Sequence, residues 1–310
     1  MPENRLTRLG KSIIMGLTVF GKLERGAYVV NSLRVAKVLN NNVIIANHPE
    51  RGEVVVIGKG IGFNRKTGDS IPLEAVEKMF ILTNQQEQEQ YKQLIPQVDE
   101  RLIEVIGEII MYISGKTQTE LNEHIHIALT DHLAFAIKRA EQDIAFHNPF
   151  LFETKEIYPM EFELAEYAIR LIKERLDVDL GEDEIGFVAL HINSAMTNRH
   201  ISEVRGHAQL IADLVGIIET ELQFSILRNS LDYSRLLTHL RFAIERVRRG
   251  EQVSEVDKLE LLLKQEYPVL YSLAYKLTKV MEQRLKMPVY KAEVSYLTMH
   301  LHRVAPENLQ

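Results

Sequence analysis

The feature that most constrains the fold is an internal duplication in the last two thirds of the chain. Residues 132–139 match residues 239–246 at six of eight positions, 107 residues later. The pair Tyr158-Pro159 recurs as Tyr267-Pro268, and residues 184–191 recur in outline as 293–300, both 109 residues later. Three ordered matches at a nearly constant offset predict two homologous copies of one domain of roughly 105 residues.

The repeated part has the hydrophobic period of helices. Leu102, Val105, Ile106, Ile109 and Ile110 fall at i, i+3, i+4, i+7 and i+8, which indicates one buried helix face. Similar stripes continue to the C-terminus. We therefore expect two all-α helical-bundle domains, over residues 97–203 and 204–310.

The N-terminal part has a different pattern. Short apolar runs at 34–38, 43–46, 53–57 and 78–82 alternate with turns rich in Asn, Gly and Pro, which predicts a small antiparallel β-sheet over residues 34–82. So small a core favours dimerisation. The polar residues 83–96 are expected to form a linker, and residues 1–33 a poorly ordered extension.

Charge is divided unevenly between these parts. Residues 1–82 hold 12 Lys and Arg against 7 Asp and Glu, a net +5, so a total of −6 leaves −11 for the remainder. A basic N-terminal part followed by an acidic remainder favours a nucleic-acid contact in the N-terminal domain. The absence of cysteine excludes disulfides and thiolate chemistry, and it fits a reducing cytoplasm. No apolar run reaches the roughly 18–20 residues that would cross a membrane.

The basic N-terminal domain has side chains suited to RNA binding. Lysines can meet phosphates, asparagines can bond base edges, an aromatic ring can stack on an unpaired base, and glycine permits a close backbone approach. The alternative is ordinary turn chemistry around a buried Phe63. The candidate contacts are Lys37, Asn40, Asn42, Gly58, Lys59 and Phe63.

Two histidines are present in both copies of the helical domain: His132 with His239, and His191 with His300. A neutral imidazole is nucleophilic at cellular pH and can accept a phosphoryl group, which adds nearly two negative charges. Arg139 and Arg246 follow the first histidine of each copy by seven residues and can sense that charge, unless they only face solvent. The other interpretations are core histidines or a metal site.

Metal binding and catalysis have weaker support in the sequence. His124 and His126 have no counterpart in the second copy, and no metal-ligand spacing such as HExxH occurs. There is no nucleophile motif of a hydrolase. We expect no catalytic residues, no metal and no cofactor.

Residues 37–43 (KVLNNNV) and 57–63 (IGKGIGF) resemble the co-antiterminator RNA-binding domain of the BglG/SacY/LicT family. The helical copies, with His132, His191, His239 and His300 in their local contexts, resemble that family's two phosphotransferase-system (PTS) regulation domains. The resemblance covers residues 33–310. Residues 121–132 and 148–151 are similar to the glucose-operon members.

This resemblance implies a mechanism. A dimeric N-terminal sheet would bind a ribonucleic antiterminator hairpin in the leader of a nascent sugar-transport mRNA and prevent the terminator from forming. The six candidate contacts would meet RNA, and the four histidines would be phosphorylated by the phosphocarrier HPr and a sugar-specific enzyme II. The protein would be a cytoplasmic homodimer without membrane insertion, and not an enzyme.

Two alternatives stay open. The first is a DNA-binding activator with the same regulatory domains, although residues 34–82 show no helical period from which a helix-turn-helix could be built. The second is an all-α metal-dependent hydrolase using His124, His126, Asp131 and His191.

Overall fold

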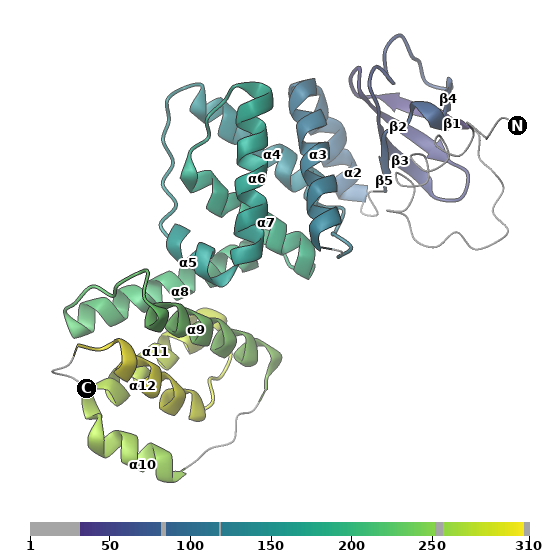
Figure 1. Ribbon diagram of the computed structural model, residues 1–310. Coiled ribbons are helices and arrows are strands. Elements are labelled where there is room, and N and C mark those ends of the chain that lie inside the picture. Colours follow the sequence, from purple (N-terminus) through teal and green to yellow (C-terminus); the bar gives the residue numbers. More distant parts are fainter. Residues whose placement is uncertain (1–31, 82–84, 118, 252–256, 307–310) are drawn as a thin grey trace, which may run out of the picture. The chain divides into compact units, whose positions relative to one another are not determined.

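The computed structural model describes residues 32–81, 85–117, 119–251 and 257–306 (Figure 1). The chain forms two compact units, residues 1–135 and 136–310, and each is described by itself. The extension expected over residues 1–33 lies outside the described residues up to position 31. Ser32 and Leu33 already belong to the first strand, where Leu33 is fully buried.

The first unit begins with a five-stranded antiparallel sheet in the order β4-β1-β2-β3-β5, as predicted. Its strands are β1 (Ser32–Val38), β2 (Val43–His48), β3 (Gly52–Ile57), β4 (Ser70–Pro72) and β5 (Lys78–Phe80). The sequence pattern missed β4, because this strand of three residues carries a single apolar side chain, Ile71. A short helix, η1 (Leu73–Ala75), leads from β4 toward β5.

Both faces of this sheet are buried. One face holds a compact cluster that includes Leu33, Val35, Ile44, Val56 and Ile71. The residues that alternate with it, Val43, Ile45, Val55 and Ile57, are also at most 5% exposed. A strand buried on both sides reads as a continuous apolar run, which is the pattern of residues 54–57.

Helices of the first unit cover the second face. Here α2 (Gln85–Leu94) occupies the segment expected to be a linker, and its Tyr91 is 1% exposed. The ring of Tyr91 meets Phe80 of β5 edge to face at 5.7 Å, and Lys92 pairs with Glu53 of β3 at 3.0 Å. The polar composition of residues 85–94 thus belongs to a helix that is docked through a few side chains. After η2 (Ile95–Gln97), α3 (Glu100–Thr117) buries all five apolar residues of its predicted stripe.

The remaining helices follow in two similar series. The first is α4 (Ile125–Ala140), α5 (Leu151–Ile157), α6 (Pro159–Leu176) and α7 (Glu182–Thr197). The long helix α8 (Ile201–Leu222) leads to α9 (Leu231–Arg249), α10 (Asp257–Glu266), α11 (Pro268–Leu285) and α12 (Ala292–Val304). No helix in the described ranges is both long and apolar enough to cross a membrane.

Local geometry repeats between the two series, as the duplication predicts. Helices α6 and α11 each have 18 residues and a proline at the start. Their N-caps, Tyr158 and Tyr267, share φ −130° with ψ 55° and 56°. Both helices end in a left-handed residue, Asp177 and Lys286. Proline is favoured in the first helical turn because that N–H has no intrahelical partner.

The core of the second unit is continuous across the two copies. One cluster joins Phe150, Ile157 and Leu190 of the first series with Leu214 and Leu236 of the second. The division predicted at residue 203 falls within α8, whose buried face belongs to this shared cluster. The two compact units divide within α4, between residues 135 and 136.

Candidate functional site

The turn between β1 and β2 is organised by its own asparagine side chains. Asn40 Oδ1 accepts hydrogen bonds from the backbone N–H of Asn42 at 2.9 Å and of Val43 at 2.8 Å. An asparagine that bonds the backbone two residues on is a standard turn-forming device. The carbonyl of Asn41 accepts from the N–H of Gly62 at 2.8 Å, so the turn is tied to the loop after β3.

Two glycines allow these loops to approach closely. A Cβ on Gly58 would lie 2.3 Å from the carbonyl oxygen of Ala75, and a Cβ on Gly62 would lie 2.2 Å from that of Asn40. Any side chain there would displace backbone. Gly58 therefore has a packing role in addition to the contact predicted for it.

Asn42 is a buried candidate RNA contact, at 8% exposure. Its Oδ1 accepts from the N–H of Gly60 at 2.7 Å, and its Nδ2 donates to Glu104 Oε1 of α3 at 2.9 Å. The N–H of neighbouring Asn41 donates to Glu100 Oε1 at 3.1 Å. The sequence analysis missed both glutamates, although their i, i+4 spacing places them on one face of α3.

Three of the other candidates are exposed to solvent, whereas Gly58 is buried and Asn40 is partly buried. Phe63 is 63% exposed, so the alternative of a buried Phe63 is wrong. Lys37 on β1 and Lys59 in the loop after β3 are exposed as well. An exposed aromatic ring can stack on an unpaired base, and exposed lysines on the same domain can meet its phosphates.

A partly buried histidine of α4, His126, lies against strand β5 of the sheet. The rings of His126 and Phe80 stack with centroids 3.8 Å apart and planes 3° from parallel. Burial, with a smaller contribution from Lys78, lowers the pKa of His126 to about 3. His124 instead faces Glu87, 3.3 Å from Nδ1 to Oε1. Among the described residues no three His, Cys, Asp or Glu side chains are grouped to hold a metal.

In the second copy the two predicted histidines meet. The rings of His239 on α9 and His300 on α12 lie 3.4 Å apart at 26°. Burial is the largest cause of the lowered pKa of both, and His300 is lowered to about 4 with His239 and Arg303 contributing. Both rings are therefore neutral near pH 7, the form in which a ring nitrogen is nucleophilic.

The two arginines that follow the histidines are held in ion pairs. Arg246 binds Glu293 of α12 through two bonds of 2.7 Å, and Glu293 is 2% exposed. In the first copy Arg139 pairs with the equivalent Glu184 of α7. Arg246 is one cause of the lowered pKa of His239, so its charge reaches the ring. The alternative of solvated arginines is wrong.

The first-copy histidines are each half-buried. His132 lies on α4 within the first unit and His191 on α7 within the second. Their matched partners, His239 and His300, lie on the corresponding helices α9 and α12 of the second copy.

The architecture defines a regulator in which a small β-sheet domain precedes two copies of a histidine-bearing helical domain. The CAT RNA binding domain family matches residues 33–89, and the PRD domain family matches residues 107–195 and 212–304.

Similar proteins share this whole arrangement. The chain is 52% identical over 273 residues to the "PtsGHI operon antiterminator" of Bacillus subtilis (strain 168), covering 88% of this chain and 97% of that relative. It is 38% identical to "Protein GlcT" of Staphylococcus saprophyticus, with 88% and 97% covered, and 38% identical to the "GlcA/glcB genes antiterminator" of Staphylococcus carnosus, with 88% and 96% covered.

A solved structure, "Crystal structure of GlcT CAT-PRDI", matches at TM-score 0.50 and 53% identity, and covers 54% of this chain and 99% of that one. The chain belongs to the family of transcriptional antiterminators that join a CAT RNA-binding domain to two PRD domains.

Proposed function

We propose that this chain prevents transcription termination at a glucose phosphotransferase operon by binding an RNA hairpin in the leader of the nascent message. The observation that carries the proposal is the order of domains, one CAT domain before two PRD domains, shared along nearly the full length of a relative named as the antiterminator of such an operon.

We propose Lys37, Asn40, Asn42, Gly58, Lys59 and Phe63 as the RNA-binding residues. Exposed Phe63 offers a stacking platform, and Lys37 and Lys59 offer charge. Asn40 shapes the turn and Gly58 lets the loops pack, so these two act by holding the others in place. Asn42 reaches RNA only after its side chain leaves Glu104.

We propose His132, His191, His239 and His300 as phosphorylation sites. The second-copy pair gives the best support, because two neutral rings are in contact beside Arg246. A phosphoryl group on either ring would bring nearly two negative charges next to the buried carboxylate of Glu293. Repulsion there would favour rearrangement of α9 against α12, which is the kind of two-state element that a phosphorylation switch requires.

The proposed donors are the phosphocarrier HPr and a sugar-specific enzyme II. Incubating the full chain with phosphoenolpyruvate, enzyme I and HPr, with and without enzyme II, and mapping acid-labile phosphate by mass spectrometry tests this proposal. Single His→Ala variants at the four positions should each lose one site. Phosphate found only on other residues would remove these assignments.

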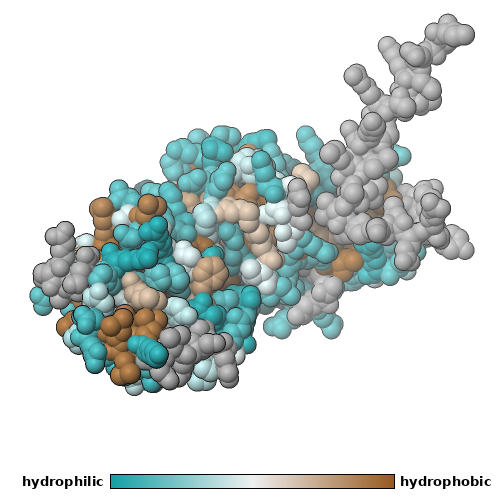
Figure 2. All heavy atoms as spheres, turned by 60° about the horizontal axis from the view of Figure 1, so that its bottom comes forward, coloured by the Kyte–Doolittle hydropathy of each residue, from teal (hydrophilic) through white to brown (hydrophobic). Residues whose placement is uncertain are grey.

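We propose a homodimer, which would pair two small RNA-binding surfaces. Figure 2 shows apolar side chains gathered on the face where α10 lies, and Leu261 and Leu262 of that helix are 60% and 52% exposed. Exposed apolar clusters on a soluble protein are typical of protein–protein contacts. Sedimentation analysis of the full chain and of Leu262→Ser tests whether this patch contributes to the dimer.

The proposed domains are the RNA-binding domain at 34–82, a connecting segment at 83–96 that includes α2, and regulatory domains at 97–203 and 204–310. The proposed location is the cytoplasm, where nascent RNA and the phosphotransferase proteins meet.

RNA binding by the full chain tests the main proposal. We expect selective binding to the leader hairpin over duplex DNA of the same sequence, and a preference that persists as salt is raised. Lys59→Gln should lower the salt dependence, because each phosphate contact releases condensed counterions. Equal and steeply salt-dependent binding to RNA and DNA would mean only non-specific attraction to phosphates.

A further inference from the structure

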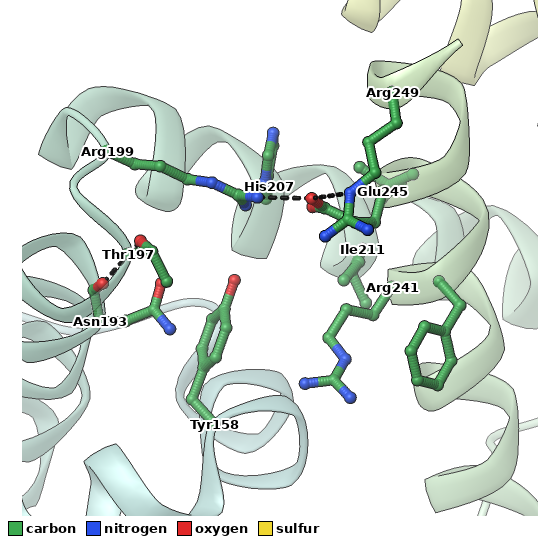
Figure 3. A pocket seen from close by; sticks show the side chains of 11 residues that line it. Tyr158, Asn193, Thr197, Arg199, His207, Ile211, Arg241, Glu245 and Arg249 are labelled. Carbon is green, nitrogen blue, oxygen red and sulfur yellow. Dashed lines mark hydrogen bonds and ion pairs between the residues drawn. The ribbon is translucent and has the colours of Figure 1, made fainter. Parts of the chain in front are cut away.

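A polar cavity in the second unit lies between the two helical copies, away from the paired histidines. Its volume is about 240 Å³. Tyr158, Asn193 and Thr197 of the first copy form one wall, and residues of α8 and α9 in the second copy form the other (Figure 3). The cavity is thus placed where a bound molecule would touch both copies.

Positive charge dominates the lining. Arg199, Arg241 and Arg249 face the cavity, and Glu245 is the one carboxylate among the lining residues. Glu245 accepts from Arg199 at 2.5 Å and from Arg249 at 3.2 Å. Outside the lining, Arg199 also pairs with Glu203 at 3.7 Å and Arg249 with Glu251 at 3.5 Å. Among the described residues, Arg241 is the lining arginine that has no carboxylate partner.

The nearby carboxylates behind the lining are already engaged. Glu161 accepts from the Asn193 amide at 2.8 Å, and Glu203 pairs with Arg248. His207 also lines the cavity, and burial, followed by Arg248, lowers its pKa, so it is neutral near pH 7.

Arg241 has most of its donors available. Within the described part of the chain its guanidinium donates one bond, to the carbonyl of Ile157 at 3.0 Å, and lies over the Phe242 ring. A guanidinium carries five N–H donors, and its planar fork matches two oxygens of a phosphate. Arg241 is therefore the cation of this cavity best placed to take an external anion.

Tyr158 adds a hydroxyl that points into the same space (Figure 3). Its side chain is 8% exposed, and the hydroxyl makes no hydrogen bond with the residues that the structure describes. Arg241 and Arg199 both act on it, yet burial prevails and raises its pKa to about 12, so the phenol remains a donor. Because the hydroxyl faces the cavity, an anion bound there could accept its hydrogen bond.

The volume of the cavity limits which ligands can bind in it. A volume of about 240 Å³ is below the roughly 300–1,000 Å³ of sites for drug-sized molecules. It suits a phosphate group with a small organic substituent. A phosphate monoester carries close to two negative charges at neutral pH and would give the Arg241 guanidinium a counter-charge.

We propose that this cavity binds a small phosphate monoester, held by Arg241, Arg199 and the Tyr158 hydroxyl, and that the ligand joins the two regulatory copies. The ligand would make this assembly a sensor of a free phosphorylated metabolite, separate from phosphorylation of the histidines. The proposal does not depend on the RNA target.

Calorimetry and thermal unfolding of the full unphosphorylated chain test the proposal. The probes are inorganic phosphate and glucose 6-phosphate, with glucose and chloride at matched ionic strength as controls. We expect saturable binding of both phosphates and a rise in Tm that follows occupancy, since a ligand that binds only the folded state stabilises it. Glucose and chloride should produce neither effect.

Variants locate the site. Arg241→Gln should weaken phosphate binding about tenfold or more, as expected for losing a charge-assisted contact. Tyr158→Phe removes only the hydroxyl and should weaken binding severalfold while preserving the fold. The matched control is Arg235→Gln, an exposed arginine of α9 that pairs with Asp232 outside the cavity lining. Absence of saturable binding, or equal binding by Arg241→Gln, Tyr158→Phe and the control, would overturn the proposal.

Discussion

The side-chain amide of Asn42 donates a 2.9 Å hydrogen bond to Glu104 of α3, so a carboxylate of the helical region occupies a candidate RNA contact. Glu100 of the same helix holds the adjacent backbone N–H of Asn41. RNA that bonds Asn42 must displace Glu104 and approach against its charge. The contact therefore opposes RNA binding in this conformation.

Removing that charge should increase RNA affinity. We expect Glu104→Gln to bind the leader hairpin about fivefold more tightly, since two unit charges about 4 Å apart in water interact by roughly 1 kcal/mol. Electrophoretic mobility shift with the full chain measures the change. The control is Glu120→Gln, beyond the far end of α3, whose stretch from Glu104 to Thr117 is about 20 Å long by helix rise. Equal affinities of both variants would contradict the account.

The exposed ring of Phe63 should contribute by stacking. Phe63→Ala is expected to weaken binding to the hairpin by about 1–3 kcal/mol, the range measured for base–aromatic stacking. Because the ring is 63% exposed, unfolding of the variant should match the parent. A loss of binding accompanied by an equal loss of stability would mean that the ring supports the fold and does not contact RNA.

The stacked histidines predict a pH dependence of stability. The pKa of His300 falls from 6.5 in the unfolded chain to about 4 in the fold, so the unfolded state binds more protons between these values. The stability that the fold gains by keeping His300 neutral is fully present above pH 6.5 and is lost as pH falls toward 4. Urea unfolding across this range should show less loss in His300→Gln than in the parent. NMR titration of His300 near 6.5 would contradict this prediction.

A buried hydrogen bond links the two helical copies. Tyr233 of α9 donates to Glu153 of α5 at 2.7 Å, and Glu153 is 6% exposed. Tyr233→Phe should cost about 2 kcal/mol, because it leaves a buried carboxylate without its donor. Tyr271→Phe removes a similar bond to Glu260 from a more exposed ring and should cost less. Chemical denaturation compares the two variants, and a larger cost for Tyr271→Phe would be the contrary result.

Sequence patterns predicted those features that local periodicity determines. The stripe from Leu102 to Ile110 and the strands from β1 to β3 are visible because their residues alternate or repeat with the period of the element. The sequence indicated that His239 and His300 matter, because both positions are histidine in both copies, and the structure stacks the two rings. The sequence also repeats both members of each ion pair, because Arg139 and Glu184 match Arg246 and Glu293.

Features set by long-range packing were not predictable. The sequence of helix α2 predicts a linker because it is mostly polar. Its attachment to the fold depends on a single buried ring, Tyr91. The contact of Glu104 with Asn42 spans 62 residues and depends on how α3 lies against the turn. The cavity of Arg241 and Tyr158 likewise assembles side chains from separate helices, none of which has a distinctive spacing.

Transcription in vitro tests the central claim most directly. The fraction of transcripts that read through the terminator would be measured with purified polymerase on a template carrying the glucose-operon leader, with and without the full chain. We predict that the chain raises readthrough, that a disrupted hairpin abolishes the effect, and that Phe63→Ala reduces it. Unchanged readthrough with folded protein, or an equal increase on the template with a disrupted hairpin, would contradict the assignment as an RNA antiterminator.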